Sequence, residues 1–395
     1  MKKIVIIGGG ASGMVAAISA KKENNEVIIL EKNNILGKKI LATGNGRCNY
    51  FNEIQDVSKY SSTTPKLLKE IISIENINMV LDFFNSLGII PKIKNGYYYP
   101  YSNKSENIKK ILEDKIKELG IKVKYNFNIE DISYDNKFII KGNDIVEADS
   151  LIISTGGMAS PITGSTGDGY DFAKKFNHTI ISPRPALTYL KGNDKLQSIW
   201  AGIRVDAKVS LICNNEVVDT EEGELQLTKN GLSGICIFNL STKAIEEKNK
   251  SVEIGINFMP FIEPIMAVEF FKQRKEENCI KVLEGFLNLK LIKAFTEILN
   301  IKEDAKIEEV DIPSLIKLLT DYRFKVEGHG SFEDSQTTSG GVSLEEVNRQ
   351  TFASLKQENL YLTGELLDVS GKCGGYNLTF AWISGISAGL DASIN

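Results

Sequence analysis

The feature that most constrains the fold is a glycine-rich turn near the N-terminus. Residues 2–21, KKIVIIGGGASGMVAAISAK, read as an apolar strand, a glycine turn and a helix rich in small residues. Gly8 permits a tight turn, Gly10 lets the backbone approach a pyrophosphate, and Gly13 lets the helix pack on the strand. The helix would then begin with free N–H groups and the positive end of its dipole at the phosphate. The GxGxxG pattern in this context predicts a dinucleotide site, whereas a plain glycine turn would need no such spacing.

The second strand supports this interpretation. The segment EVIIL, residues 26–30, is followed directly by Glu31. A carboxylate at this position can accept hydrogen bonds from the adenosine ribose hydroxyls, and it would repel a 2′-phosphate. We also include Ala11, Ser12 and Lys32 among the predicted cofactor-binding residues.

The chain after Glu31 indicates which dinucleotide is bound. A nicotinamide dehydrogenase would continue with further short βαβ units. Here residues 121–157 read instead as a strand, a meander with turns at 135–136 and 142–144, and a last buried strand ending in Thr155, Gly156 and Gly157. This layout is typical of FAD-binding domains of the glutathione-reductase type, and we place Ile129 in the same predicted site.

Six segments carry a resemblance to a known family. They are GGGASGMVAA, GKKILATGNGRCN, STGGMASPITGSTGDGYDFAKKF, GELQLTKNGLSG, TSGGV and YLTGELLDVSGKCGGYNLTFAWISG. The chain resembles bacterial FAD-binding flavoproteins labelled aminoacetone-oxidase-like, which also include bile-acid enone reductases and an enzyme that reduces a uridine in large-subunit ribosomal RNA. The resemblance implies FAD and a flavin domain interrupted by an inserted domain.

The predicted fold class is therefore α/β: a glutathione-reductase-type Rossmann FAD-binding domain with an inserted small β-barrel and helical domain. We predict the FAD-binding domain at 1–186 and 337–395, a β-barrel-like insert at 187–258, a helical cap at 259–320, and a return strand at 321–336. The segment GICIFNLS, residues 234–241, alternates like a barrel strand, and Asn214-Asn215 reads as a hairpin turn. In the helical part, a core face is expected at Ile265, Val268, Phe271, Ile280 and Leu283.

A second glycine-rich segment, TGNGRCN, follows Glu31 by about a dozen residues and is predicted to border the flavin ring. Thr43, Gly44, Asn45 and Gly46 would bring backbone amides close to ring or ribityl atoms. Arg47 would place a fixed positive charge near the flavin or an anionic substrate. Cys48 is either a reactive thiol beside the flavin or a small buried hydrophobe, and we favour the second reading.

The C-terminal segment supplies the other half of the predicted site. Gly364, Glu365 and Asp368 are placed to hold ribityl hydroxyls or pyrophosphate, as a related motif does in other flavoproteins. A long helix is predicted to start at about Gly374, Gly375, Tyr376 and Asn377, with its N-terminus aimed at the flavin. Asp168 starts another helix after a glycine-rich loop. Fumarate-reductase flavoproteins carry a similar pattern with a histidine where this chain has Gln336, so dicarboxylate reduction is not expected.

These residues together predict an FAD-dependent oxidoreductase. The leading function is reduction of a conjugated C=C bond, in a small enone or in a ribosomal RNA uracil that becomes dihydrouridine. The alternatives are an oxidase of a small amine such as aminoacetone and a non-catalytic flavin-binding partner protein. Arg47, Cys48 and Tyr376 are the catalytic candidates, and a bound water is a further candidate proton donor. No second GxGxxG is present, so NAD(P)H would bind only transiently as electron donor.

Composition sets the remaining expectations. The formal net charge is −4, so an RNA substrate would need a local basic rim, for which Lys38, Lys39, Arg47 and Lys372 are candidates. Five widely spaced cysteines and two histidines suggest no disulfide framework and no metal site. The glycines interrupt the N-terminal apolar run, so we expect no membrane span and a cytoplasmic protein.

Overall fold

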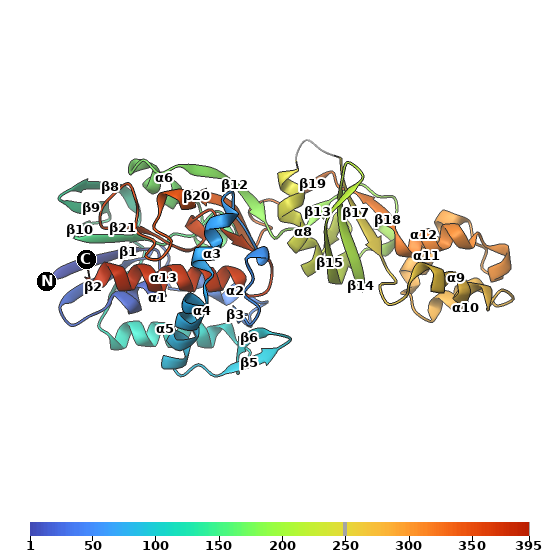
Figure 1. Cartoon of the computed structure of the whole chain (residues 1–395), viewed down its shortest axis with the longest axis horizontal. Coiled ribbons are helices and arrows are strands. Elements are labelled where there is room, and N and C mark those ends of the chain that lie inside the picture. The colour runs from blue at the N-terminus through green and yellow to red at the C-terminus, as the bar shows by residue number, and fades with distance from the viewer. Residues whose placement is uncertain (248–250, 395) are drawn as a thin grey trace. The chain divides into compact units, whose positions relative to one another are not determined.

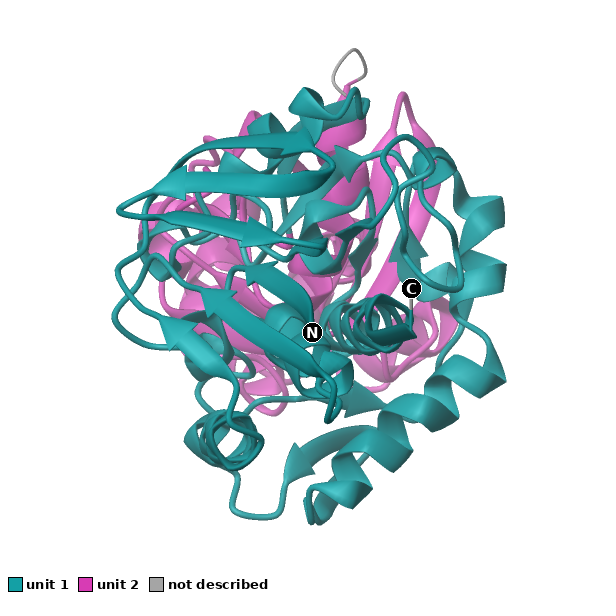
Figure 2. Cartoon of the chain, turned by 90° about the vertical axis from the view of Figure 1, so that its left-hand side faces the viewer, with its two compact units in different colours: residues 1–186, 335–395 teal, residues 187–334 magenta. Residues whose placement is uncertain are grey.

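The computed structural model describes residues 1–247 and 251–394, which form two compact units. The first unit combines residues 1–186 with residues 335–395, and the second comprises residues 187–334. Figure 1 labels the elements of the chain and Figure 2 colours the two units. The proposed division of the insert into three parts stays a prediction.

A five-stranded parallel sheet organises the first unit. Its order is β21 (Leu360–Leu362), β11 (Ser150–Ile153), β1 (Lys2–Ile7), β2 (Asn25–Leu30) and β7 (Lys122–Lys124). The four residues Ile4–Ile7 of the central strand β1 are all buried, as expected where helices or other layers cover both faces of a parallel sheet. Because β21 follows the insert and pairs with β11, the two separated parts of the chain complete one Rossmann-type sheet.

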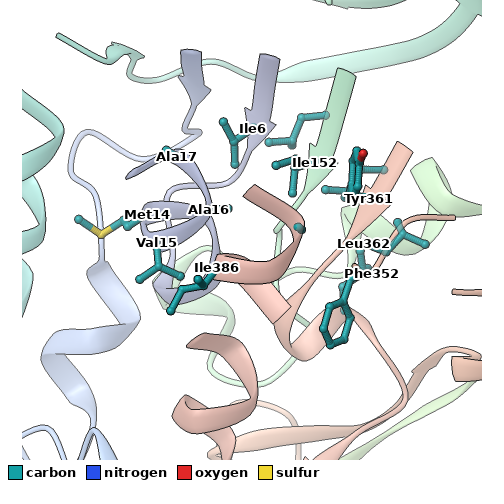
Figure 3. Packing of buried hydrophobic residues seen from close by; sticks show 14 of the residues in the cluster. Ile6, Met14, Val15, Ala16, Ala17, Ile152, Phe352, Tyr361, Leu362 and Ile386 are labelled. Atoms are coloured by element: carbon teal, nitrogen blue, oxygen red, sulfur yellow. The ribbon is translucent and has the colours of Figure 1, made fainter. Parts of the chain in front are cut away.

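Two helices that are distant in sequence pack together in this unit. Helix α1 (Ala11–Ala20) lies along α13 (Tyr376–Ile394), and Figure 3 shows Val15 and Ile386 between them. Their approach requires glycine: a Cβ atom added at Gly385 would lie 2.3 Å from the Ser12 carbonyl oxygen. Among the helices in the described ranges, none has both the length and the apolar character needed to cross a membrane.

The first unit also contains four smaller sheets. A meander of β8 (Ile129–Asp135), β9 (Lys137–Gly142) and β10 (Ile145–Ala148) forms one, and β3 (Phe51–Asn52), β6 (Tyr97–Pro100) and β5 (Pro91–Lys94) form another. Two-stranded pairs join β12 (Ile180–Ala186) to β20 (Thr337–Val342) and β4 (Tyr60–Ser61) to β22 (Ser370–Gly371). The remaining helices are α2 (Lys38–Ala42), α3 (Leu68–Ile71), α4 (Ile74–Ser86), α5 (Ser105–Glu118) and α6 (Asp168–Lys175), with short 3₁₀ turns η1 (Val57–Lys59), η2 (Pro65–Leu67), η3 (Pro161–Thr163), η5 (Leu344–Glu346) and η6 (Gly364–Leu366).

The second unit contains a seven-stranded antiparallel sheet and a group of helices. The strand order is β18 (Tyr322–Lys325), β17 (Val252–Asn257), β14 (Ile203–Cys213), β15 (Glu216–Leu227), β16 (Gly231–Ser233), β13 (Leu190–Lys191) and β19 (Gly328–His329). Among the described residues the two end strands do not pair with each other. The helices are α7 (Gln197–Trp200), α8 (Ile235–Glu246), α9 (Pro264–Lys272), α10 (Cys279–Glu284), α11 (Leu289–Leu299) and α12 (Ile312–Thr320), with a 3₁₀ turn η4 (Ile307–Glu309). Asn214 and Asn215 have φ of 50° and 68°, which are the positive angles that a tight hairpin turn between β14 and β15 requires.

Two local predictions for the insert are wrong. Residues 234–241 were expected to be a strand, but they enter helix α8. Ile237, Leu240 and Ala244 are buried at helical spacing, and a short apolar run cannot by itself distinguish a buried strand from a buried helix. Ile265 was expected in the core face of α9, but its side chain is 77% exposed, because Ala267 and Phe271 form the buried side of that helix.

Candidate functional site

A cavity in the first unit opens at the carboxyl ends of β1, β2 and β11. This is where parallel α/β sheets bind their ligands. Its wall contains the glycine turn after β1, the residues that follow β2 and β11, part of α2, and the first turn of α13. The predicted cofactor residues in this wall are Gly8, Gly10, Ala11, Ser12, Glu31, Lys32, Thr43, Ile129, Thr155, Gly156, Asp168, Glu365 and Asn377.

The three glycines of the turn have three different environments. Gly8 has φ of 95°, and a Cβ atom there would lie 2.6 Å from the Ser154 carbonyl oxygen. A Cβ atom at Gly13 would lie 1.9 Å from the Gly8 carbonyl oxygen, so only glycine lets α1 pack on the turn. A Cβ atom at Gly10 would meet no heavy atom within 4 Å, because this residue faces the open cavity. A ligand can therefore approach the backbone at Gly10.

Helix α1 presents its N-terminus to the same space. Its N-cap is Gly10, which offers no side-chain cap, and the first intrahelical bond recorded runs from the Met14 N–H to the Gly10 carbonyl at 3.0 Å. The N–H groups of Ala11 and Ser12 precede that bond and have no partner one turn earlier in the helix. They form a natural binding place for an anion.

Glu31 anchors the turn from the end of β2. Its Oε2 atom accepts the Gly9 N–H at 2.7 Å, and its Oε1 atom accepts the Asn33 N–H and side-chain amide, each at 2.7 Å. The carboxylate is buried but remains in the cavity wall. An ionised carboxylate has about four acceptor positions, so it can accept a ligand hydroxyl as well as these three bonds.

An ion pair closes the wall beside Glu31. The Lys32 Nζ atom lies 2.8 Å from Asp168 Oδ2, and Thr166 donates to the other oxygen of that carboxylate at 2.8 Å. Burial alone would raise the pKa of Asp168, but the bonds from Lys32 and Thr166 outweigh it and hold the pKa below its ordinary value. The negative charge also lies at the start of α6, where the helix dipole favours it.

A second ion pair also lies in the cavity wall. Lys39 Nζ is 2.8 Å from Glu365 Oε2, and Glu365 Oε1 accepts the N–H and hydroxyl of Thr338 at 3.0 and 2.9 Å. The neighbouring Thr337 also lines the cavity, and its buried Oγ1 atom has no hydrogen-bond partner among the described residues. A buried polar atom without a partner costs free energy unless a ligand or water completes it, so this atom fits a cavity that holds a polar ligand.

The first turn of α13 forms the cavity wall next to this pair. Asn377, Leu378 and Ala381 line the cavity. The Asn377 side chain bonds both the N–H and the carbonyl of Gly371, at 2.8 and 2.7 Å, and so fixes the loop that precedes the helix. The positive end of the α13 dipole therefore lies at the cavity.

The structure leaves the other predicted site residues outside this wall. They are Gly13, Gly44, Asn45, Gly46, Arg47, Cys48, Gly157, Gly364, Asp368, Gly374, Gly375 and Tyr376. Most belong to the loop after α2 or to the loop before α13, and each of these loops joins a residue that does line the cavity, Thr43 or Asn377.

Asp368 and Gly364 make structural contacts, and their predicted cofactor contacts stay predictions. Asp368 Oδ2 accepts the Thr63 N–H at 2.9 Å and the Ser62 hydroxyl at 3.3 Å, and burial raises the pKa of this carboxyl. The carboxylate thus holds the 62–63 segment. A Cβ atom at Gly364 would lie 2.5 Å from Ser12 Oγ, so this glycine lets η6 approach α1.

The three catalytic candidates differ in their surroundings. Cys48 is fully buried in the hydrophobic core, and burial raises the pKa of its thiol to about 12, so the thiolate is disfavoured at neutral pH. Tyr376 is buried with its ring edge against Tyr60, at 5.6 Å between centroids. Arg47 is exposed; its Nε atom donates to the Gly44 carbonyl at 3.2 Å and its guanidinium lies 5.5 Å from the centre of the Tyr99 ring.

Sequence reasoning missed several residues of the wall. Asn33, Phe127 and Thr337 were not predicted to bind the cofactor. Thr337 follows Gln336 directly. The comparison of Gln336 with the histidine of the fumarate-reductase pattern could therefore have indicated that Thr337 lies at the site. In the described part of the chain no group of three or more His, Cys, Asp and Glu side chains is arranged to hold a metal ion.

Comparison with known proteins finds a family and relatives that match most of the chain. The family described as HI0933-like protein Rossmann domain matches residues 2–391. A 3-dehydro-bile acid delta(4,6)-reductase from Clostridium scindens is 36% identical over 375 residues, which cover 92% of this chain and 91% of that protein. A ribosomal RNA dihydrouridine synthase from Haemophilus influenzae is 27% identical over 370 residues, which cover 91% of this chain and 90% of that one.

A solved structure shares the fold at lower similarity. The 3-ketosteroid delta1-dehydrogenase from Sterolibacterium denitrificans, in complex with 1,4-androstadiene-3,17-dione, aligns with a TM-score of 0.54 and 11% identity, and the alignment covers the whole of both chains. At this identity the likeness describes the fold alone.

Proposed function

The chain belongs to the HI0933-like Rossmann family, and from this premise we propose that it is an FAD-dependent oxidoreductase that reduces a conjugated C=C bond. The observation that carries the proposal is the cavity in which the N-terminus of α1, the Glu31 carboxylate and the N-terminus of α13 meet. A cavity built from these three elements suits a dinucleotide with a redox-active ring.

The wall residues divide the binding of FAD among themselves. The N–H groups of Ala11 and Ser12 would bind the pyrophosphate, while Glu31 would accept a ribose hydroxyl. Thr337 Oγ1 and the Asn377 end of α13 would face the remainder of the cofactor. FAD, when bound, supplies the hydride that the substrate accepts.

The protein's own residues would then control charge and the proton. The N-terminus of α13 places positive potential at the cavity, which favours negative charge that develops there. Cys48 and Tyr376 lie outside the wall, so we assign delivery of the proton to a water, oriented by Thr337 Oγ1, whose hydrogen-bonding capacity is unused.

Two substrates share the chemistry that this site would perform. A small enone and a uracil both contain a C=C bond conjugated with a carbonyl group, so a hydride adds to the β carbon and a proton to the α carbon in each. The names of the two relatives above correspond to these two substrates. We propose NAD(P)H as the electron donor, binding transiently because the sequence contains no second GxGxxG turn.

A nucleoside analysis tests the substrate. Ribosomal RNA from a strain that lacks this gene would be digested and its dihydrouridine measured, beside an assay of the purified protein on a 3-oxo-4,6-diene steroid and on aminoacetone. We expect loss of one dihydrouridine that the wild-type gene restores and the Gly10→Val variant does not, or reduction of the steroid. Oxidation of aminoacetone with neither reduction would replace the proposal by the oxidase alternative.

A further inference from the structure

The small sheet β3–β6–β5 presents tyrosine and lysine side chains on one face. Lys92 lies opposite Tyr99, and Lys94 opposite Tyr97. Residues directly opposite one another in an antiparallel pair share a face, so these four form a tyrosine–lysine face. The other face carries Tyr98, which packs against Phe51 with 5.2 Å between ring centres and is therefore directed to the core.

The tyrosine–lysine face is basic although the whole chain is acidic. Lys92 and Lys94 are exposed, and Arg47 lies over the Tyr99 ring at 5.5 Å. Among the described residues none of these three cations has a carboxylate within ion-pair distance. One acidic residue, Glu53, lies beside the 95–96 turn, where its N–H donates to the Gly96 carbonyl.

Two segments of the chain connect this face to residues of the cavity wall. A Cβ atom at Gly374 would lie 2.8 Å from the Tyr97 ring, and Asn52 of β3 donates to the Gly374 carbonyl at 2.9 Å. Gly374 leads into α13, whose residue Asn377 lines the cavity. On the other side, Arg47 belongs to the loop that begins at Thr43, another wall residue. Figure 1 shows β3, β6 and β5 together at one edge of the first unit.

Aromatic rings interleaved with cations are what unpaired nucleotides require. Bases stack on exposed rings, and lysine or arginine contacts the phosphates between them. A small enone would need no such surface outside the cavity. Resting on the RNA form of the proposed function, we propose that the tyrosine–lysine face binds unpaired nucleotides that flank the target uracil of an RNA substrate.

A binding assay separates stacking from charge. FAD-loaded protein would be titrated with a fluorescein-labelled single-stranded oligouridylate at several salt concentrations, with the same strand in a duplex as comparison. Lys92→Ala/Lys94→Ala should weaken binding and lower the slope of log K against log salt by ~1.4, at ~0.7 per phosphate contact on single strands. Tyr99→Ala should weaken binding roughly fivefold or more with the slope unchanged, and Tyr99→Phe should restore it.

A matched control comes from the meander. Tyr134 and Lys141 are an exposed tyrosine and lysine of β8 and β9 outside the cavity wall, so Tyr134→Ala/Lys141→Ala should bind as wild type does. Flavin content and melting temperature would be measured for every variant.

The outcomes distinguish this inference from the proposed function. Two results would contradict nucleotide binding by the tyrosine–lysine face: wild-type protein that does not prefer the single strand, and face variants that bind as tightly as the control variant. Competition by poly-L-glutamate as strong as by oligouridylate would also overturn it, since the face would then bind any acidic polymer, an acidic protein partner included. If the protein shows the expected binding pattern but reduces neither uracil nor enone, the proposed reaction is wrong and RNA binding by the tyrosine–lysine face is still supported.

Discussion

Lys39 and Glu365 stand 326 positions apart in the chain and form an ion pair of 2.8 Å in the cavity wall. One comes from α2, before the insert, and the other from η6, after it. Both side chains are about three-quarters or more buried, so water screens the pair less than it screens an exposed one. The pair therefore ties the two separated parts of the FAD-binding unit together at the site itself.

This pair should be measurable as a coupling. We expect Lys39→Met and Glu365→Gln to show an interaction free energy of ~1–2 kcal/mol in a double-mutant cycle of urea unfolding. Each single change leaves its partner charge partly buried and without a counterion. The costs of the two single changes should therefore sum to more than the cost of the double change. Strict additivity would show that the two side chains do not interact in solution. Lys110 and Asp114, an exposed pair on α5, provide the control and should couple by less than ~0.5 kcal/mol.

Gly10 and Gly13 should respond differently to the same substitution. Gly10→Val adds atoms where the backbone meets open cavity, so the protein should fold and melt as the flavin-free wild type does, but be purified without flavin. Gly13→Val drives atoms into the Gly8 carbonyl, so it should unfold or lose several kcal/mol of stability. Flavin absorbance per protein and thermal unfolding measure both effects. A yellow Gly10→Val protein of normal stoichiometry would show that the cofactor does not approach this turn.

The buried thiol of Cys48 should be inert in the native protein. Its pKa is raised from 9.0 to about 12 by burial, so it stays protonated at pH 9.0, where an ordinary thiol is half ionised. Because the folded pKa is the higher one, this group favours the folded state below pH 9.0, and that contribution is lost as the pH rises towards 12. Iodoacetamide at pH 9.0 should label Cys48 only after unfolding. Rapid native labelling would place the thiol in an accessible site.

Arg47 was predicted to border the reactive end of the cofactor, and that role stays a prediction. We expect Arg47→Ala to keep its FAD, because the proposed pyrophosphate and ribose contacts come from Ala11, Ser12 and Glu31 of the cavity wall, which does not include Arg47. Loss of a charge-assisted contact costs ~1.5–3 kcal/mol, so turnover should fall roughly tenfold to a few hundredfold if the contact forms only in the transition state. Arg47→Lys should rescue only part, because an ammonium lacks the planar fork. Single-turnover kinetics with the identified substrate measures this, and an unchanged rate would make Arg47 a surface residue.

The sequence was sufficient for the parts of the site that depend on local backbone chemistry. The GxGxxG spacing predicted the tight turn at Gly8 and the close helix packing at Gly13, which the short Cβ distances at both positions match. The cofactor contacts of Gly10 and Glu31 stay predictions, although both residues line the cavity. Residues brought in by tertiary contacts were harder to predict. Asp368 stands in a motif that suggested a ligand contact, yet the fold gives it the amide of Thr63 as a partner, which no spacing along the chain reveals.

The insert shows the same limit. The double asparagine at 214–215 was a sufficient signal for a hairpin turn, because positive φ at both positions favours asparagine. Residues 234–241 were read as a strand because their apolar run is too short to show its period, and packing against β15 decides in favour of the helix.

The central claim is that the protein passes electrons from a flavin to a conjugated C=C bond, and anaerobic reoxidation of the reduced protein tests it most directly. Protein reduced with one equivalent of dithionite would be mixed, without oxygen, with a 3-oxo-4,6-diene steroid, with a uracil-containing ribosomal RNA fragment, or with buffer, while flavin absorbance is recorded. The account predicts that one of the two acceptors restores the oxidised spectrum stoichiometrically and gains one hydrogen molecule by mass, whereas buffer leaves the flavin reduced. A flavin that stays reduced with both acceptors, in a protein whose oxidised form is reduced by aminoacetone, would contradict it.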